Sequence, residues 1–210
     1  MYQNFIQKLT AELKNPLPGI EVQKHMAPMP GSNDRFNFKK SNEAKLGGVM
    51  ILLYPDNGKI MFPLTERAKY PGVHSGQISF PGGKHEPEDE DLVHTAKRET
   101  FEEIGVEMEA IQVIGKLSEL YIPPSNFHVY PCIAYLEEKP KFKEETFEVV
   151  KIIETDITTL LREDIAKRNE IQVNEKLRMN VPYFDIYDHI VWGATAMMLN
   201  EFKTIIKKII

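Results

Sequence analysis

The stretch that decides the fold is GGKHEPEDEDLVHTAKRETFEEIGV, residues 82–106. Pro87 near its start and Gly105 near its end predict a helix between them, since proline suits a first helical turn and glycine the position after the last. Within this span, apolar and small residues recur at helical spacing and predict one buried stripe. The stripe consists of Leu92, Val93, Ala96, Thr100 and Ile104.

Three carboxylates gather on the last turns of this helix. Glu99, Glu102 and Glu103 fall within an arc of roughly 100°, because residues three and four apart share a face. Like charges at these spacings repel by a few tenths of a kcal/mol, and acids in a last turn face the negative end of the helix dipole. Arg98 can pair with Glu102 but neutralises only one charge. A divalent cation would offset the rest, since Mg²⁺ and Mn²⁺ prefer carboxylate oxygens. The alternative is a solvated acidic face.

The glycine, arginine and acid positions of this stretch resemble the signature box of the Nudix hydrolases. The matching residues are Gly83, Arg98-Glu99, Glu102-Glu103 and Gly105. Gly83 to Arg98 spans fifteen positions, one more than is usual in the family. The upstream acid of the box is therefore either Asp89 or Glu90. The subgroup that resembles coenzyme A pyrophosphatases has the same extra residue.

A second match lies directly upstream of the box. LTERAKYPGVHSGQISFPGG, residues 64–83, resembles the segment that marks this coenzyme A subgroup. The two matches together cover residues 64–106, about a fifth of the chain. The resemblance implies an α+β fold with a mixed β-sheet core between helices, and an enzyme that hydrolyses a nucleoside diphosphate linked to another moiety.

The resemblance also implies roles for individual residues. The expected metal ligands, holding Mg²⁺ or Mn²⁺, are Glu99, Glu102 and Glu103. The expected catalytic residues are Glu102, Glu103, Arg98 and, from a later loop, Glu148, with Glu144 and Glu145 competing for the loop position. The expected substrate contacts are Arg67, His74, Gln77, Gly82 and Gly83. For Arg67 and His74, a surface charge or a local hydrogen bond is an equally open reading.

The leading hypothesis is metal-dependent hydrolysis of the pyrophosphate bond of coenzyme A or acyl-CoA, giving 3′,5′-ADP and a 4′-phosphopantetheine-type product. Another diphosphate substrate such as ADP-ribose is one alternative, and a non-catalytic nucleotide-sensing module is another. The expected partner is thus a small-molecule nucleotide substrate. Trp192 and the apolar C-terminal face around Ile205 and Ile206 are expected to cover the core, with a homodimer contact as the alternative reading of that face.

Composition narrows the remaining classes of function. The 210 residues are 42% hydrophobic and 27% charged, and a net charge of −5 gives no electrostatic reason to expect binding to nucleic acid. The single cysteine, Cys132, excludes an intrachain disulfide and is expected to be a small buried residue. His85 and His94 fit no zinc spacing and are expected to be exposed. No secretory signal and no apolar run of ~18 residues is evident, which favours a cytoplasmic protein without a membrane partner.

The rest of the chain predicts two parts, an N-terminal helix and irregular arm in residues 1–46 and a core domain in residues 47–210. Within the first part, residues 2–14 are expected to be helical and 16–46 irregular. Strands over 47–54 and 59–65 are joined by PDNG, because Asn-Gly is a strong hairpin signal. Further strands are expected over 78–80, 111–120, 129–136 and 149–153. The remaining expected elements are a helical turn over 157–161, a return hairpin around Asn174 and Asn180, and a helix over 197–209.

Overall fold

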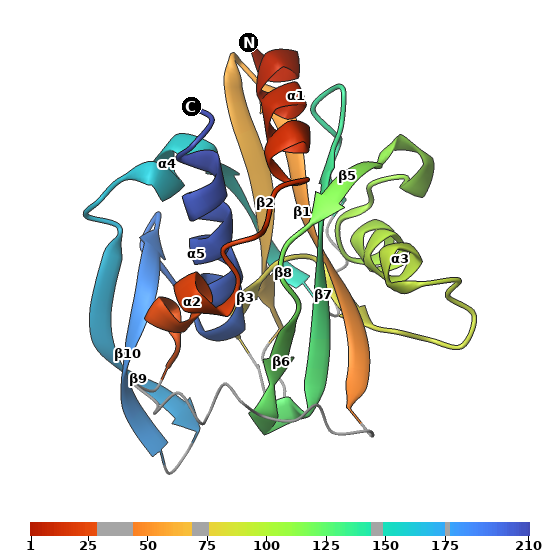
Figure 1. Ribbon diagram of the computed structural model, residues 1–210. Helices are drawn as coiled ribbons and strands as arrows, with labels where there is room; N and C mark the ends of the chain where they lie inside the picture. The colour runs from red at the N-terminus through yellow and green to blue at the C-terminus, as the bar shows by residue number, and fades with distance from the viewer. Residues whose placement is uncertain (29–43, 69–75, 144–148, 175–176) are drawn as a thin grey trace.

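The computed structural model describes residues 1–28, 44–68, 76–143, 149–174 and 177–210 (Figure 1). Its centre is an eight-stranded sheet in which strands are ordered β3-β2-β1-β7-β5, while β4 pairs with β1, β6 with β7 and β8 with β2. The strands are β1 (Lys45–Asp56), β2 (Lys59–Arg67), β3 (Ile78–Ser79), β4 (Gly82–Lys84), β5 (Gln112–Lys116), β6 (Leu120–Ile122), β7 (Phe127–Tyr135) and β8 (Val149–Asp156). Only the β1–β7 pair among them is parallel, so the sheet is mixed.

Helices cover both faces of this sheet. Strand β1 alternates between the two faces: Ile51 and Leu53 pack with α1 (Tyr2–Glu12) and α5 (Gly193–Ile206), whereas Met50 and Leu52 pack with α3 (Leu92–Ile104). Such alternation is what a strand buried on both sides requires. The expected α+β fold, with a mixed sheet between helices, is confirmed.

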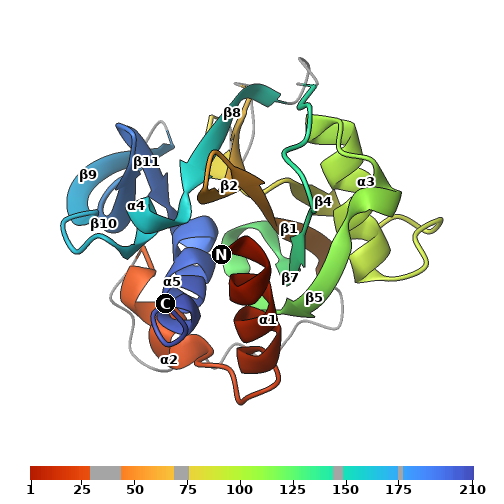
Figure 2. The same ribbon diagram turned by 90° about the horizontal axis from the view of Figure 1, so that it is seen from above.

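A smaller sheet lies beside α5, on the side of the molecule away from α3 in both views (Figures 1 and 2). It has the order β11-β10-β9, and both of its strand pairs are antiparallel. Its strands are β9 (Ala166–Asn174), β10 (Leu177–Ile186) and β11 (His189–Trp192), and α4 (Ile157–Leu161) connects β8 to them. The remaining short elements are α2 (Ile20–Gln23) and the 3-10 helices η1 (Lys24–Met26), η3 (Met108–Ala110) and η4 (Pro123–Ser125).

Three of the local expectations are confirmed directly. Asn57 and Gly58 have φ of 48° and 78°, the left-handed values that a two-residue hairpin turn requires, and they join β1 to β2. At the C-terminus, Ile205 and Ile206 of α5 are buried in the core of the same chain, so this face is core cover. Cys132 is likewise buried, and burial raises the pKa of its thiol to about 12.

The single strand expected over residues 111–120 is wrong, because two strands, β5 and β6, occupy this region. A register shift between Val113 and Gly115 breaks the regular pairing with β7. Beyond it, the backbone N–H of Ser118 points to the carboxylate of Glu201 on α5, at 3.3 Å from Oε2, and not to a neighbouring strand. A long-range contact therefore ends the strand.

Two further expectations are wrong in part. The arm is not wholly irregular, because α2 follows Gly19, whose φ of 63° allows the chain to turn into a helix. Asn180 does not lie at a hairpin turn: it lies inside β10, opposite Glu170. The turn between β10 and β11 is formed by Tyr187 and Asp188, with φ of 51° and 67°. Among the helices that the structure describes, none is long and apolar enough to cross a bilayer.

Candidate active site

Helix α3 begins later than its proline suggests. Asp91 is the N-cap, and its Oδ1 accepts the backbone N–H of His94 at 2.7 Å. The expected start near Pro87 is therefore wrong, since residues 86–89 form a turn in which the N–H of Glu86 donates to Asp89 Oδ2 at 3.0 Å. The predicted end is confirmed: Gly105 has φ of 71° and its N–H donates to the carbonyl of Phe101.

Asp89, and not Glu90, is the upstream acid that reaches the arginine of the box. Its side chain is fully buried, whereas Glu90 is exposed. Arg98 donates to both carboxylate oxygens of Asp89, from Nε at 2.9 Å and from Nη2 at 3.0 Å. This guanidinium holds the pKa of the Asp89 carboxyl well below its usual value. The pair thus fixes the loop before α3 against the helix.

The two histidines near this pair are half-buried, so the expectation that both are exposed is wrong. His94 Nδ1 lies 3.0 Å from Asp89 Oδ1, and His85 Nδ1 lies 3.0 Å from the hydroxyl of Thr95. Thr95 in turn donates to Asp89 Oδ2 at 2.8 Å. These side chains surround Asp89 with hydrogen bonds, as a buried carboxylate requires.

Arg98 contacts three carboxylates, which corrects the expectation that it neutralises one. Besides Asp89, its Nη1 lies 3.0 Å from Glu99 Oε1 and 3.0 Å from Glu102 Oε2. The side chain of Glu102 is 53% exposed, while that of Glu99 is 13% exposed. Arg98 therefore links the turn before the helix to two of the three expected metal ligands.

Glu103 is the most enclosed of the three acids, with 2% of its surface exposed. Its Oε2 accepts the backbone N–H of Gly82 at 3.2 Å, and its Oε1 lies 3.4 Å from Nη1 of Arg67. The backbone N–H of Arg67 donates to the carbonyl of Gln77 at 3.0 Å. Arg67 of the upstream segment and Glu103 of the box, 36 residues apart in the sequence, thus meet at the carboxylate of Glu103.

The glycine pair makes this closeness of strand and helix possible. A Cβ atom at Gly83 would lie 2.4 Å from the carboxylate of Glu99. Gly82 has φ of 149°, and a Cβ there would lie 2.4 Å from the carbonyl oxygen of Gly48 on β1. Both residues therefore allow close approach of backbone and side chain, as the sequence leads one to expect of a glycine pair before a helix.

The charge balance of this cluster fits a divalent cation. Asp89, Glu99, Glu102 and Glu103 carry four negative charges, and Arg67 and Arg98 carry two positive ones, which leaves a formal charge of −2. Oxygen donors with an excess negative charge are the surroundings that Mg²⁺ and Mn²⁺ prefer. Among the side chains that the structure describes, no three converge as a preformed metal site.

Of the other expected site residues, the structure describes one group and leaves the other out. Gln77 belongs to the first and lies beside Arg67, because its carbonyl accepts the backbone N–H of Arg67. His74, Glu148 and the competing Glu144 and Glu145 lie outside the described residues. The sequence left open whether Asp89 is the upstream acid of the box. Its contact with Arg98 could have been inferred, because a buried acid and an arginine each require a partner of opposite charge.

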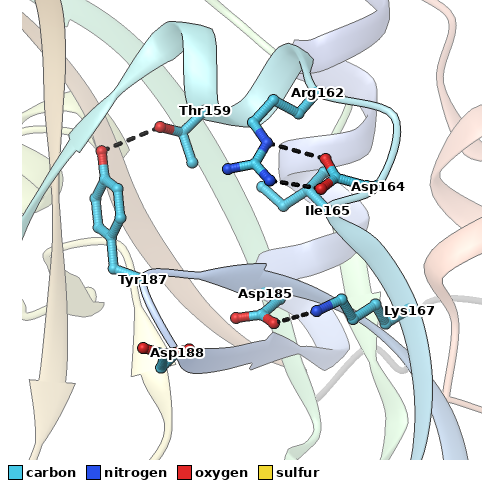
Figure 3. A pocket seen from close by; sticks show the side chains of 8 residues that line it. All are labelled: Thr159, Arg162, Asp164, Ile165, Lys167, Asp185, Tyr187 and Asp188. Carbon is cyan, nitrogen blue, oxygen red and sulfur yellow. Dashed lines mark hydrogen bonds and ion pairs between the residues drawn. The ribbon is translucent and has the colours of Figure 1, made fainter.

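A cavity of about 250 Å³ lies elsewhere, between α4 and the turn that joins β10 to β11 (Figure 3). Two cations line it, and each is paired with an aspartate: Arg162 with Asp164, and Lys167 with Asp185 at 2.6 Å. None of its lining residues belongs to α3 or β4. Internal ion pairs account for its charged lining apart from Asp188, so the carboxylates of α3 remain the candidate active site.

The chain is similar to known proteins in sequence and in fold. The family model described as NUDIX domain matches residues 45–178. Nudix hydrolase 15, mitochondrial, from Arabidopsis thaliana is 32% identical over 86% of this chain, which spans 63% of that relative's length. The uncharacterized Nudix hydrolase NudL of Yersinia pestis is 30% identical over 66% of this chain and 68% of its own length. The crystal structure of a MutT/nudix family protein from Enterococcus faecalis covers 91% of this chain and 76% of its own, with a TM-score of 0.51 at 14% identity, a likeness of fold.

Proposed function

Because the chain belongs to the Nudix hydrolase family, we propose that it hydrolyses the pyrophosphate bond of coenzyme A or acyl-CoA. The products would be 3′,5′-ADP and a 4′-phosphopantetheine-type compound. One observation carries the proposal: Arg67, from the upstream segment that resembles the coenzyme A subgroup, lies 3.4 Å from Glu103 of the box. The segment that would set the substrate and the residues that would perform the chemistry thus form one site.

In the proposed reaction, the oxygen of one water molecule attacks one phosphorus of the diphosphate. The new P–O bond forms as the bond from that phosphorus to the bridging oxygen breaks, and the bridging oxygen leaves with the other phosphate. Bound by Glu99, Glu102 and Glu103, Mg²⁺ or Mn²⁺ would neutralise charge on the diphosphate and lower the pKa of the attacking water. The protein positions these acids through Arg98, which joins Glu99 and Glu102 to the buried Asp89.

A carboxylate must also take the proton of the attacking water. Glu102 and Glu103 are two candidates, and Glu103 is the better enclosed. The third is Glu148, which directly precedes Val149, and the Cα of Val149 is paired with that of Arg67 across β2 and β8. The base is therefore to be sought among these three acids.

Arg67 is the residue that would contact the phosphates of the substrate. Its Nη1 contacts Glu103, and 25% of the side chain is exposed to solvent. A planar guanidinium suits phosphate oxygens, which it binds in a bidentate manner. Gln77 and His74 would add contacts from the same segment.

The test is a substrate panel with the full chain. Coenzyme A, an acyl-CoA, ADP-ribose and a dinucleoside polyphosphate are each supplied with Mg²⁺ or Mn²⁺, and products are identified by mass spectrometry. We expect coenzyme A or acyl-CoA to give the highest kcat/KM and to yield 3′,5′-ADP. Equal or faster cleavage of ADP-ribose would overturn the assignment of the substrate, and no cleavage of any compound, together with nucleotide binding, would favour a sensing module.

A further inference from the structure

Strand β9 is the outer strand of the small sheet, and it pairs with another described strand only along one side. Both views place it at the outside of the molecule (Figures 1 and 2). Residues 166–170 are all exposed, although their side chains alternate between the two faces of the sheet. An edge strand of this kind presents unpaired backbone groups to other chains.

The register shows which backbone groups point outward. In an antiparallel ladder, hydrogen-bonded and non-hydrogen-bonded pairs alternate. Arg168 lies opposite Pro182, which has no N–H to donate. The N–H of Glu170 donates to the Asn169 side chain at 2.8 Å, a local bond that a pairing strand would replace. Arg168 and Glu170 therefore turn their N–H and C=O groups away from β10.

The charges on this edge are self-complementary. Lys167 is paired with Asp185 within the sheet, as Figure 3 shows. For Arg168 and Glu170, no ion pair is found among the described residues. Their side chains share one face of the sheet and carry opposite charges two positions apart, one on each side of Asn169.

We propose that a second copy of this chain pairs with β9 through a two-fold axis at Asn169, joining the two small sheets into one antiparallel sheet. In this register Arg168 lies opposite the partner's Glu170, and Glu170 lies opposite the partner's Arg168. An axis at Arg168 would place two arginines opposite each other, and an axis at Glu170 two glutamates. Opposite charges stabilise a cross-strand pair and like charges destabilise it, so the charge pattern selects Asn169.

The two copies contribute the same short segment, so the interface is isologous and small. We therefore expect a reversible equilibrium between monomer and dimer that depends on protein concentration. The interface does not include α3, β4 or Arg67, so monomer and dimer should share the same activity per chain.

The experiment is analytical ultracentrifugation of the full chain from micromolar to millimolar concentration. Wild type is expected to dimerise. Arg168→Glu and Glu170→Arg are each expected to raise the dissociation constant about tenfold, since each places like charges at both cross-strand pairs. Arg178→Glu makes the same charge change on an exposed residue of β10, away from this edge, and is expected to behave as wild type.

Mixing the two single variants gives the decisive result. Arg168→Glu has acids at positions 168 and 170, and Glu170→Arg has arginines at both. A heterodimer of the two variants therefore regains both opposite-charge pairs, and dimerisation should return to the wild-type level. The double variant Arg168→Glu/Glu170→Arg should also dimerise as wild type. A wild type that stays monomeric, single variants that dimerise unchanged, or a mixture that stays monomeric would each overturn the proposal. Thermal melts of every variant establish that it is folded.

Discussion

The protein encloses carboxylates on two helices, and the groups around them differ. On α5, Glu201 is fully buried and its oxygens accept hydrogen bonds from neutral groups alone: the N–H of Gly19 at 2.9 Å, the side chain of Gln23 at 2.7 Å, and the N–H and hydroxyl of Ser118. At α3, Glu99, Glu102, Glu103 and the preceding Asp89 share two guanidinium groups, and a formal charge of −2 remains. The carboxylate of Glu201 is thus enclosed by hydrogen-bond donors of the protein, whereas the α3 cluster has an excess of charge shared among several acids.

The donors to Glu201 come from three distant parts of the chain. Gly19 and Gln23 belong to the N-terminal arm, Ser118 lies between β5 and β6, and α5 is the last helix. Glu201 therefore holds the arm and the loop after β5 on the core. The acids of α3, by contrast, contact residues that carry the family resemblance. Enclosed acids thus hold the fold together at one place and, as we propose, serve the chemistry at the other, and this difference can be tested by removing single groups.

The largest expected effect is on activity. Glu103→Gln keeps the size of the side chain but removes its charge and one of its two acceptor oxygens. We expect kcat to fall at least about 100-fold, because changes to groups that merely support metal ligands already cost 10–100-fold. Steady-state kinetics with Mg²⁺ measures this, and the melting temperature should change little.

Glu107→Gln is the matched control, since it makes the same change on an exposed acid just past α3. It should retain wild-type kcat. Full activity in Glu103→Gln would remove Glu103 from the site, whatever the substrate proves to be.

Glu201→Ala should show the opposite pattern. Four donor groups, that of Gln23 buried and those of Gly19 and Ser118 half-buried, would lose their acceptor, and we expect the free energy of unfolding to fall by about 3 kcal/mol. Activity per folded molecule should stay at the wild-type level. Urea unfolding and kinetics at a temperature where the variant is folded measure the two quantities. Glu163→Ala, an exposed acid between α4 and β9, is the control and should unfold as wild type. A stable Glu201→Ala would mean that Glu201 does not anchor the arm.

The two regions also differ in how far the sequence predicts them. The acids of α3 were found because a helix places residues three and four apart on one face, a local rule. Glu201 was not singled out, because its donors lie 83 to 182 residues away along the chain. One signal was present: Glu201 lies within the apolar stripe of α5, between Met198 and Ile205, where a charge needs partners.

The same distinction explains the other outcomes. The hairpin at Asn57-Gly58 and the end of α3 at Gly105 follow from the backbone preferences of a few neighbouring residues, and both are confirmed. The start of α3 was misplaced because Asp91, a better cap, follows Pro87, and because the turn that precedes it is held by Asp89. The break between β5 and β6 depends on Glu201, so no local pattern could predict it.

Asp89→Asn tests whether the α3 cluster also contributes to stability. Removing the charge that Arg98 binds at both oxygens should lower the free energy of unfolding by about 2 kcal/mol at pH 7. The pKa of Asp89 is lowered in the folded state, so its stabilising effect is fully present above the unfolded pKa of about 4 and is lost as the pH falls below it. Wild type should therefore lose stability on acidification more steeply than the variant.

Urea unfolding at a series of pH values between 7 and 3 measures both the difference at neutral pH and its decline. Glu90→Gln, which changes the exposed neighbouring acid that is the alternative in the sequence, should leave both unchanged. Equal stability of Asp89→Asn and wild type at pH 7 would contradict the role of this ion pair.

The smallest expected effect comes from Gly83→Ala, which alters the space beside the acids and not the acids themselves. The new methyl group would lie 2.4 Å from the carboxylate of Glu99, so this side chain must move away from Arg98. We expect stability to fall by about 1 kcal/mol, since inserting one methyl group into a packed site costs about this much. Because Glu99 is an expected metal ligand, the Mg²⁺ concentration for half-maximal activity should rise about tenfold. Lys84→Ala, a truncation of the exposed neighbour on β4, is the control and should leave this concentration unchanged. An unchanged Mg²⁺ requirement in Gly83→Ala would show that the position of Glu99 does not matter for cation binding.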